Sequence, residues 1–317
     1  MQIARTRPES YLRGNYPHVE TFHHTDVSEV KKVILKLKNC SAGHDEIHSK
    51  IMKAGVDIIA PTLVQLINNS FDEGICPDTL KIAKITPIFK NGDRCDVSCY
   101  RPISILPCLS KIIERLVYDR MWHHIKNNNI ICKNQFGFVK GLSIESAIIH
   151  MLQNIIPDFD NNKIVIGVFM DLSKAFDVIN HDILLLKLKH YGFINNTLAW
   201  FKSYLSNRVQ YTDINKCYSS RLPISLGVPQ GSILGPILFS IFINDLINAS
   251  NILSFLLYAD DSNMFHFHVN LKELVIEINR ELKNISEWFR CNKLLINMDK
   301  THFLIFSRKR IDVNISL

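Results

Sequence analysis

An almost continuous apolar run, KIVIGVFM over residues 163–170, most constrains what this chain can fold into. A run of this length without polar alternation is typical of a central strand that is buried on both faces. The run ends at Asp171, so a carboxylate stands at the end of a core strand. Burying such a charge is costly unless it is paired, hydrogen-bonded or bound to a metal ion. The run therefore predicts a central strand with a carboxylate of structural or functional importance at its end.

A second acidic position follows another apolar stretch. Residues 255–258 and 264–267 are short strand-like runs on either side of Asp260 and Asp261, which predicts a hairpin with acids at its tip. Carboxylates within ~4 Å of one another repel by about 4 kcal/mol at an effective dielectric near 20. A cluster with Asp171 would therefore require a divalent cation, and hard carboxylate oxygens suit Mg2+. The alternative is that Asp-Asp is ordinary turn chemistry and that Asp171 serves as a helix cap or turn residue.

The composition fits a folded, basic chain. With 47% hydrophobic and 21% charged residues, the 317-residue sequence does not fit the disordered, collagen-like or coiled-coil classes. Its 37 Lys+Arg against 30 Asp+Glu give a net charge of +7, which favours a polyanionic partner. The 8 cysteines form no regular framework and no signal peptide is recognised, so we expect an intracellular location, nuclear or cytoplasmic, and not secretion. No apolar run approaches the ~20 residues of a membrane span, so no membrane association is expected.

Elsewhere the hydrophobic pattern predicts a mixture of helices and short strands. Asp182 is expected to cap a helix through His190, and Asn195 or Asn196 a second helix through Leu205. The other expected elements are helices over residues 110–125 and 271–289 and strands over 83–89 and 304–306. Residues 1–24 mix Arg, Pro, Gly and His without a period and are expected to be poorly ordered.

Several longer motifs occur in a fixed order along the chain. They are SAGHDEI (41–47), ITPIFKNGD (85–93), YRPIS (100–104), QFGF (135–138), FMDLSKAFD (169–177), GVPQGSILGPILFSIFINDL (227–246) and YADD (258–261). From about Ser41 to Phe306 the sequence resembles the reverse transcriptases of non-LTR, LINE-type retrotransposons, and in particular those of jockey-like elements. The resemblance implies an RNA-directed DNA polymerase, that is, a nucleotidyltransferase of a mobile element.

The resemblance assigns catalytic roles to residues of the acidic motifs. It implies that Asp171, Asp260 and Asp261 hold two Mg2+ ions, with Mn2+ able to substitute. It also implies that Lys300 acts near the leaving pyrophosphate, as general acid chemistry would favour. Phe176 matches the steric gate, whose planar ring would clash with a ribose 2′-OH and so select deoxynucleotides. Without the resemblance, a phenylalanine at this position is an ordinary core residue.

Four further residues match positions that bind the incoming nucleotide. Lys90 and Arg101 correspond to residues that grip the triphosphate, a role that suits arginine through its bidentate geometry. Gln230 and Gly231 correspond to the P-Q-G turn under the nucleotide, where glycine permits close backbone approach and the amide can hydrogen-bond. Taken alone, the two cations would be solvated surface charges and the P-Q-G turn a simple helix start.

The resemblance also implies a fold, a domain order and a set of partners. We expect an α+β right-hand polymerase with an antiparallel palm sheet, and with its thumb missing. The expected segments are a poorly ordered N-terminus (1–24), fingers (25–160), a palm with the carboxylates (161–309) and a basic tail (310–317) truncated before the thumb. The expected partners are an RNA template, a DNA primer and deoxynucleoside triphosphates.

Two alternatives stay open at this point. The chain could be a catalytically inactive, nucleic-acid-binding remnant of such an element. Val139 and Leu142 stand where the family usually has basic residues, and neither a thumb nor an endonuclease is recognised in the sequence. The other alternative is a different two-metal palm enzyme such as a nucleotide cyclase, against which the P-Q-G turn and the finger motifs argue.

Overall fold

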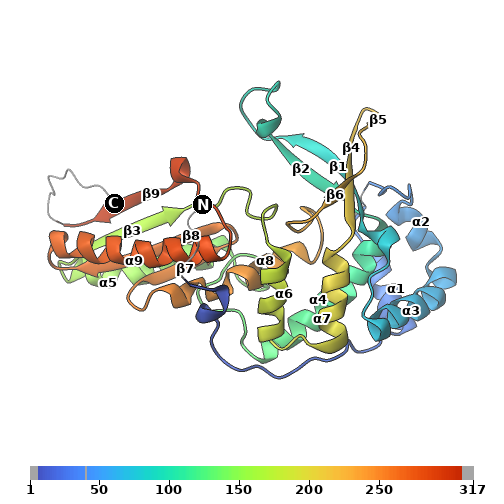
Figure 1. Ribbon diagram of the computed structural model, residues 1–317, viewed down its shortest axis with the longest axis horizontal. Helices are drawn as coiled ribbons and strands as arrows, with labels where there is room; N and C mark the ends of the chain where they lie inside the picture. The colour runs from blue at the N-terminus through green and yellow to red at the C-terminus, as the bar shows by residue number, and fades with distance from the viewer. Residues whose placement is uncertain (1–5, 40, 309–317) are drawn as a thin grey trace. The chain divides into compact units, whose positions relative to one another are not determined.

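The computed structural model describes residues 6–39 and 41–308, which fold into two compact units (Figure 1). Unit 1 comprises Met1–Gly14, Ile131–Ile183 and Phe239–Leu317, and unit 2 comprises Asn15–Ile130 and Leu184–Leu238. The units are thus interleaved along the chain, whereas the sequence-based segments 25–160 and 161–309 follow one another. The expected basic tail, 310–317, lies outside the described residues.

Unit 1 is built on a four-stranded antiparallel sheet. The strand order is β7-β8-β3-β9, so β3 is paired on both sides. Four consecutive residues of β3 are buried, as predicted from its unbroken apolar sequence. The strands are β3 (Ile164–Met170), β7 (Ser254–Tyr258), β8 (Asp261–His268) and β9 (His302–Phe306). The central strand, the acidic hairpin and the last strand are therefore confirmed.

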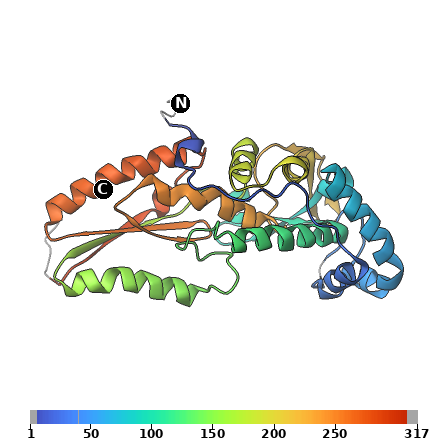
Figure 2. The ribbon, with the colours of Figure 1, turned by 90° about the horizontal axis from the view of Figure 1, so that it is seen from below.

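Helices cover both faces of this sheet, and Figure 2 shows α5 and α9 on opposite sides of it. The apolar stripe of α9 is buried, as its helical spacing predicts. On the buried face of α5, Ala147 and Ile155 pack with Val165 of β3 and Phe265 of β8. The helical elements are η1 (Pro8–Tyr11), α5 (Ile144–Asp160), η4 (Asn244–Ala249), α9 (Leu271–Cys291) and η5 (Met298–Lys300). Two helices, α6 (His181–His190) and α8 (Gly235–Ile243), contain two of the four points at which the chain passes between the units.

Unit 2 holds a five-stranded mixed sheet. Its order is β2-β1-β4-β5 with β6 also on β4, and only the β1–β4 pair is parallel among the described strands. The strands are β1 (Ile82–Phe89), β2 (Tyr100–Ile105), β4 (Arg208–Ile214), β5 (Cys217–Tyr218) and β6 (Leu222–Ile224). The helical elements are α1 (Val27–Lys36), α2 (Ser49–Ala54), α3 (Val56–Glu73), η2 (Asp78–Lys81), η3 (Val97–Cys99), α4 (Cys108–Asn127) and α7 (Asn195–Leu205). The strand predicted over 83–89 and the helix predicted over 110–125 are both present.

The described part of the segment before residue 25 is packed on the two units, although its sequence predicts poor order: residues 6–14 belong to unit 1 and residues 15–24 to unit 2. The N–H of Val19 donates to the carbonyl of Gly192 at 2.8 Å. Gly192 has φ +96°, and a Cβ there would lie 2.1 Å from the carbonyl oxygen of Pro17, so a side chain would prevent this approach. Phe22 is buried and its ring packs edge-to-face on aromatic side chains of α3 and α7. These contacts come from distant parts of the chain, which local pattern does not reveal.

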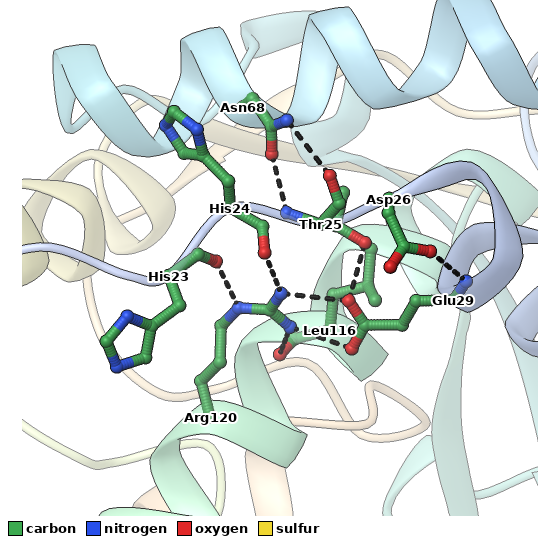
Figure 3. Close-up of polar contacts among 8 residues, drawn as sticks. All are labelled: His23, His24, Thr25, Asp26, Glu29, Asn68, Leu116 and Arg120. Atoms are coloured by element: carbon green, nitrogen blue, oxygen red, sulfur yellow. Dashed lines mark hydrogen bonds and ion pairs between the residues drawn. The ribbon is translucent and has the colours of Figure 1, made fainter.

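Residues 23–29 and Arg120 form a polar clamp that fixes the start of α1 (Figure 3). The guanidinium of Arg120, on α4, donates to the carbonyls of His23 and His24 and to both carboxylate oxygens of Glu29. Thr25 Oγ1 donates to the same carboxylate at 2.6 Å. Four hydrogen bonds donated by Arg120 therefore hold one short stretch of backbone and one glutamate against α4, and the bond from Thr25 fixes the same glutamate locally.

Two predicted helix caps are wrong. The N-cap of α7 is Ile194, because the side chains of Asn195 and Asn196 donate instead to Glu20 and to the carbonyl of Asp72. At α6 the side chain that accepts from the N–H of Ile183 is Asn180, not Asp182. No helix within 6–39 and 41–308 has the length and apolar character required to cross a bilayer.

Candidate active site

Asp171 lies where β3 ends, in a loop fixed by the segment that precedes β9. Leu172 forms an antiparallel bridge with Ile296. The backbone N–H of Asn297 donates to the carbonyl of Asp171 at 2.9 Å. Lys300 Nζ donates to Asp171 Oδ2, also at 2.9 Å. The carboxylate therefore has a fixed backbone and one cationic partner.

Asp260 and Asp261 lie at the turn of the β7–β8 hairpin, as predicted. Tyr258 pairs with Asp261 across the turn, and Ala259 adopts a left-handed φ of 56°. In the neighbouring ladder, Met170 of β3 pairs with Ser262 of β8. One residue further along each strand are Asp171 and Asp261, so the register brings the two acidic motifs together at one end of the sheet.

The charges of this cluster are unbalanced. The pKa of Asp261 is raised, first by partial burial and then by the negative charges of Asp260 and Asp171, while Lys300 acts in the opposite direction. The pKa of Lys300 is raised by its hydrogen bond to Asp171 and by the charges of the carboxylates. Three carboxylates thus face one ammonium group, and a further cation would lower the energy of the cluster.

The chemistry of the donors suits Mg2+, but the side chains do not form a ready-made cage. Within the described residues, no group of three or more His, Cys, Asp or Glu side chains is arranged to hold a metal ion. Lys300 occupies one oxygen of Asp171. The carboxylates of Asp260 and Asp261 accept no side-chain hydrogen bond from the part of the chain that is described, so their oxygens are available to a cation.

Phe176 lies in the same unit, within a group of aromatic rings. Its ring stacks on Phe239 of α8 with centroids 4.9 Å apart, and Phe138 meets it edge-on at 5.9 Å. Phe176 is half-buried, so part of its ring faces solvent. The packing holds the ring in place, as both a core residue and a steric gate require.

The QFGF motif lies directly beside the acidic hairpin and supports its turn. The sequence alone does not reveal this contact. The N–H of Phe136 donates to the carbonyl of Leu257 at 2.8 Å. A Cβ at Gly137 would lie 2.1 Å from the backbone nitrogen of Ala259, so this position excludes any side chain. Gln135 is buried and its Oε1 accepts from the N–H of Gly137. A buried glutamine beside a glycine of this kind supports the turn that carries Asp260.

Lys90 and Arg101 lie together in unit 2, on the β1–β2 hairpin. Ile88 pairs with Arg101, and the backbone of Lys90 bonds to that of Cys99. Residues that face each other across an antiparallel ladder share a face, as do residues two apart on one strand. Lys90 and Arg101 therefore share one face of the hairpin, and both are exposed.

Gln230 and Gly231 also lie in unit 2, in the turn before α8. The carbonyl of Gln230 accepts from the N–H of Ser104 at 2.7 Å. Gly231 has φ +115°, and a Cβ there would lie 2.7 Å from the carbonyl oxygen of Ser104. The turn is thus pressed against β2, and the glycine is required both by its backbone conformation and by the close approach.

The predicted site residues therefore form two groups. Unit 1 brings together Asp171, Asp260, Asp261 and Lys300 and holds Phe176. Unit 2 holds the remaining four, Lys90, Arg101, Gln230 and Gly231. The acidic cluster is observed as one group, whereas a common nucleotide site across all nine residues stays a prediction.

Comparison with known proteins gives one family. The family described as reverse transcriptase (RNA-dependent DNA polymerase) matches residues 88–312. The chain is 29% identical over 311 residues to the RNA-directed DNA polymerase from mobile element jockey of Drosophila melanogaster, a match that covers 95% of this chain and 34% of that protein. It is 31% identical over 302 residues to the probable RNA-directed DNA polymerase from transposon BS of the same species, covering 90% of this chain and 32% of that protein. The chain spans about a third of the length of the curated relatives it matches.

Proposed function

The chain belongs to the reverse transcriptase (RNA-dependent DNA polymerase) family, and from this premise we propose that it carries the polymerase site of a non-LTR retrotransposon protein. The reaction is attack of a DNA primer 3′-oxygen on the α-phosphate of a deoxynucleoside triphosphate paired with an RNA template. The observation that carries the proposal is the meeting of Asp171 with Asp260 and Asp261 at one end of the unit 1 sheet, beside Lys300. Such a surplus of carboxylates is what a divalent-cation site needs.

In this proposal Asp171, Asp260 and Asp261 would hold two Mg2+ ions, with Mn2+ able to substitute. Bound Mg2+ polarises the attacking and leaving oxygens of a phosphoryl transfer. The chain's own contribution is placement: Asn297 fixes the backbone of Asp171, and the tight turn at Ala259 directs the two hairpin acids to the same end of the sheet. Positioning of this kind supplies much of the rate enhancement in such reactions.

Lys300 is proposed to neutralise or protonate the leaving pyrophosphate. Its raised pKa keeps the ammonium charged at neutral pH. The side chain is 57% exposed, so it can reorient once Asp171 is neutralised by another cation. Before substrate binds, its ion pair with Asp171 would hold the lysine close to the reacting groups.

The remaining residues are proposed to bind the nucleotide. Phe176 would exclude a ribose 2′-OH by the position of its packed ring. Lys90 and Arg101, on one face of the β1–β2 hairpin, would contact the triphosphate. Gln230 and Gly231 would support the nucleotide from the turn against β2.

The two units are proposed to correspond to the palm and the fingers of a right-hand polymerase. Unit 1, with its four-stranded antiparallel sheet and the carboxylates, would be the palm. Unit 2, with the β1–β2 hairpin, would form the fingers. This assignment replaces the consecutive segments 25–160 and 161–309 with two discontinuous ones.

A second candidate is a nucleic-acid-binding remnant without catalysis. The observation that favours it is the absence, in the described chain, of three side chains arranged around one metal position. A remnant of this kind would bind RNA through its basic surface with strong salt dependence and would not extend a primer.

The test is Mg2+-dependent extension of a labelled DNA primer on an RNA template by the purified chain. We expect Asp260→Asn and Asp261→Asn each to lower extension at least roughly a hundredfold, because each removes a negatively charged metal ligand. Asp299→Asn is the matched control, since this exposed aspartate precedes Lys300 and has no contact assigned to the site; it should stay within about threefold.

Two results would contradict the proposal. Extension that survives in both hairpin variants would locate the chemistry elsewhere. Salt-dependent RNA binding without any extension by the unaltered chain would favour the remnant.

A further inference from the structure

A buried glutamate in unit 2 belongs to none of the motifs considered so far. Glu114, on α4, is 1% exposed. Its Oε1 accepts from Ser110 Oγ at 3.2 Å and from the Tyr204 hydroxyl at 3.1 Å. Its Oε2 accepts from the backbone N–H of Ile233 at 2.6 Å and, more weakly, from that of Leu234 at 3.4 Å. Four donors from three separate parts of the chain thus converge on one carboxylate.

The two backbone donors lie immediately after the P-Q-G turn. Ser232 links that turn to the start of α8, because its Oγ donates to the carbonyl of Pro229 and accepts from the N–H of Gly235. The carbonyl of Gln230 is held from the other side by Ser104. Glu114 therefore supports the end of a turn whose beginning is fixed by β2.

A buried cation compensates the charge of Glu114. Arg208 is 1% exposed, lies with its guanidinium 4.9 Å from the Tyr204 ring centroid, and donates to the Tyr204 carbonyl. Burial raises the pKa of Glu114, while the charge of Arg208 and the N–H donors act to lower it. A buried pair of this kind is weak evidence for stability alone, since an apolar pair often stabilises as well. What an apolar residue cannot replace is the acceptor for the two backbone N–H groups.

We propose that Glu114 is a positioning residue that sets the geometry of the Gln230–Gly231 turn for nucleotide binding, through its hydrogen bonds to Ile233 and Leu234. The inference rests on the proposed function, in which this turn supports the incoming nucleotide. It predicts that the reach of the carboxylate, and not its charge, determines the affinity for nucleotide.

Two conservative variants separate reach from charge. Glu114→Gln keeps an oxygen in reach of the backbone donors, and its amide can donate to the hydroxyls of Tyr204 and Ser110, which also accept. Glu114→Asp keeps the charge opposite Arg208 but is one methylene shorter and withdraws from the N–H groups. We expect Glu114→Asp to raise KM for deoxynucleotide about tenfold with kcat within about threefold, and Glu114→Gln to leave both within about threefold.

A second measurement does not depend on catalysis. Amide hydrogen exchange in the chain without nucleotide should be about tenfold faster at residues 230–235 in Glu114→Asp than in Glu114→Gln, with exchange in β3 unchanged. Should the unaltered chain fail to extend primers, the proposed function fails while this exchange result still tests the role of Glu114. The inference is overturned if Glu114→Gln is the impaired variant, if both variants bind nucleotide equally well, or if exchange at 230–235 is the same in both.

Discussion

The two units each contain an acidic site, and the two sites differ in how far neighbouring donors and cations compensate the negative charge. In unit 2, Glu114 accepts hydrogen bonds from two hydroxyls and two backbone N–H groups and lies near the buried charge of Arg208. In unit 1, the described residues supply the three carboxylates with one ion-pair partner, Lys300, and that partner is exposed. A carboxylate whose acceptor sites are filled holds structure together. Carboxylates that mainly face one another are suited to bind a cation from solution.

The largest effect that separates the two sites is on stability in the absence of metal. We expect Glu114→Ala to lower the free energy of unfolding by about 3–5 kcal/mol, because it leaves Arg208 buried without its counter-charge and two backbone N–H groups without an acceptor. Denaturation by urea, followed by circular dichroism at pH 7, measures this change.

The matched control is Glu73→Ala, which removes an exposed carboxylate at the end of α3. Its effect should stay within about 0.5 kcal/mol. If Glu114→Ala cost no more than this control, the carboxylate in unit 2 would not be structural and the contrast between the units would disappear.

An intermediate effect is expected from Mg2+. Added at ten times its dissociation constant, the ion should stabilise the folded chain by about 1.4 kcal/mol, since it binds the folded state through Asp171, Asp260 and Asp261. In Asp261→Asn this gain should largely vanish. The metal-free variant should be no less stable than the unaltered chain, because it removes one of three like charges. Thermal melting with and without Mg2+ provides the measurement.

Asp299→Asn again serves as the control, and it should keep the full response to Mg2+. An Asp261→Asn chain that is clearly less stable than the unaltered one without metal would show that this aspartate has a structural role like that of Glu114.

Local pattern in the sequence predicted the elements that position the acidic cluster. The unbroken apolar run gave β3, the paired short runs gave the β7–β8 hairpin, and the helical spacing gave α9, because each of these depends on neighbours along the chain. The strands predicted an acid at the end of each, but the meeting of Asp171 with Asp260 and Asp261 was implied by the resemblance to non-LTR reverse transcriptases, since the local pattern also allowed turn and cap roles.

Contacts between distant segments could not be predicted in the same way. The partners of Glu114 come from α7 and from the turn before α8, far along the chain. Asn195 and Asn196 are good caps by type, yet Glu20 and the backbone of Asp72 compete for them. The interleaving of the two units has the same origin, since no local period marks where the chain crosses from one to the other.

The smallest expected effect concerns pH, and it gives opposite signs for Glu29, which is held by hydrogen-bond donors, and for Asp261 of the acidic cluster. Burial raises the pKa of Glu29, but the hydrogen bonds from Arg120 and Thr25 in the clamp of Figure 3 outweigh it and lower the pKa below 4.5. The stabilisation by Glu29 is thus complete above about pH 4.5 and lost as pH falls through the lower folded-state value. For Asp261 the pKa is raised above 3.8, so the destabilisation that its charge causes in the metal-free chain appears as pH rises through that range.

On acidification the unaltered chain should therefore lose stability relative to Glu29→Gln and gain stability relative to Asp261→Asn. Each change should be less than about 1 kcal/mol, because both groups are partly screened by water. Urea titrations of the three chains between pH 3 and 7 test this, and curves of the same sign would mean that Asp261 is held by donors much as Glu29 is.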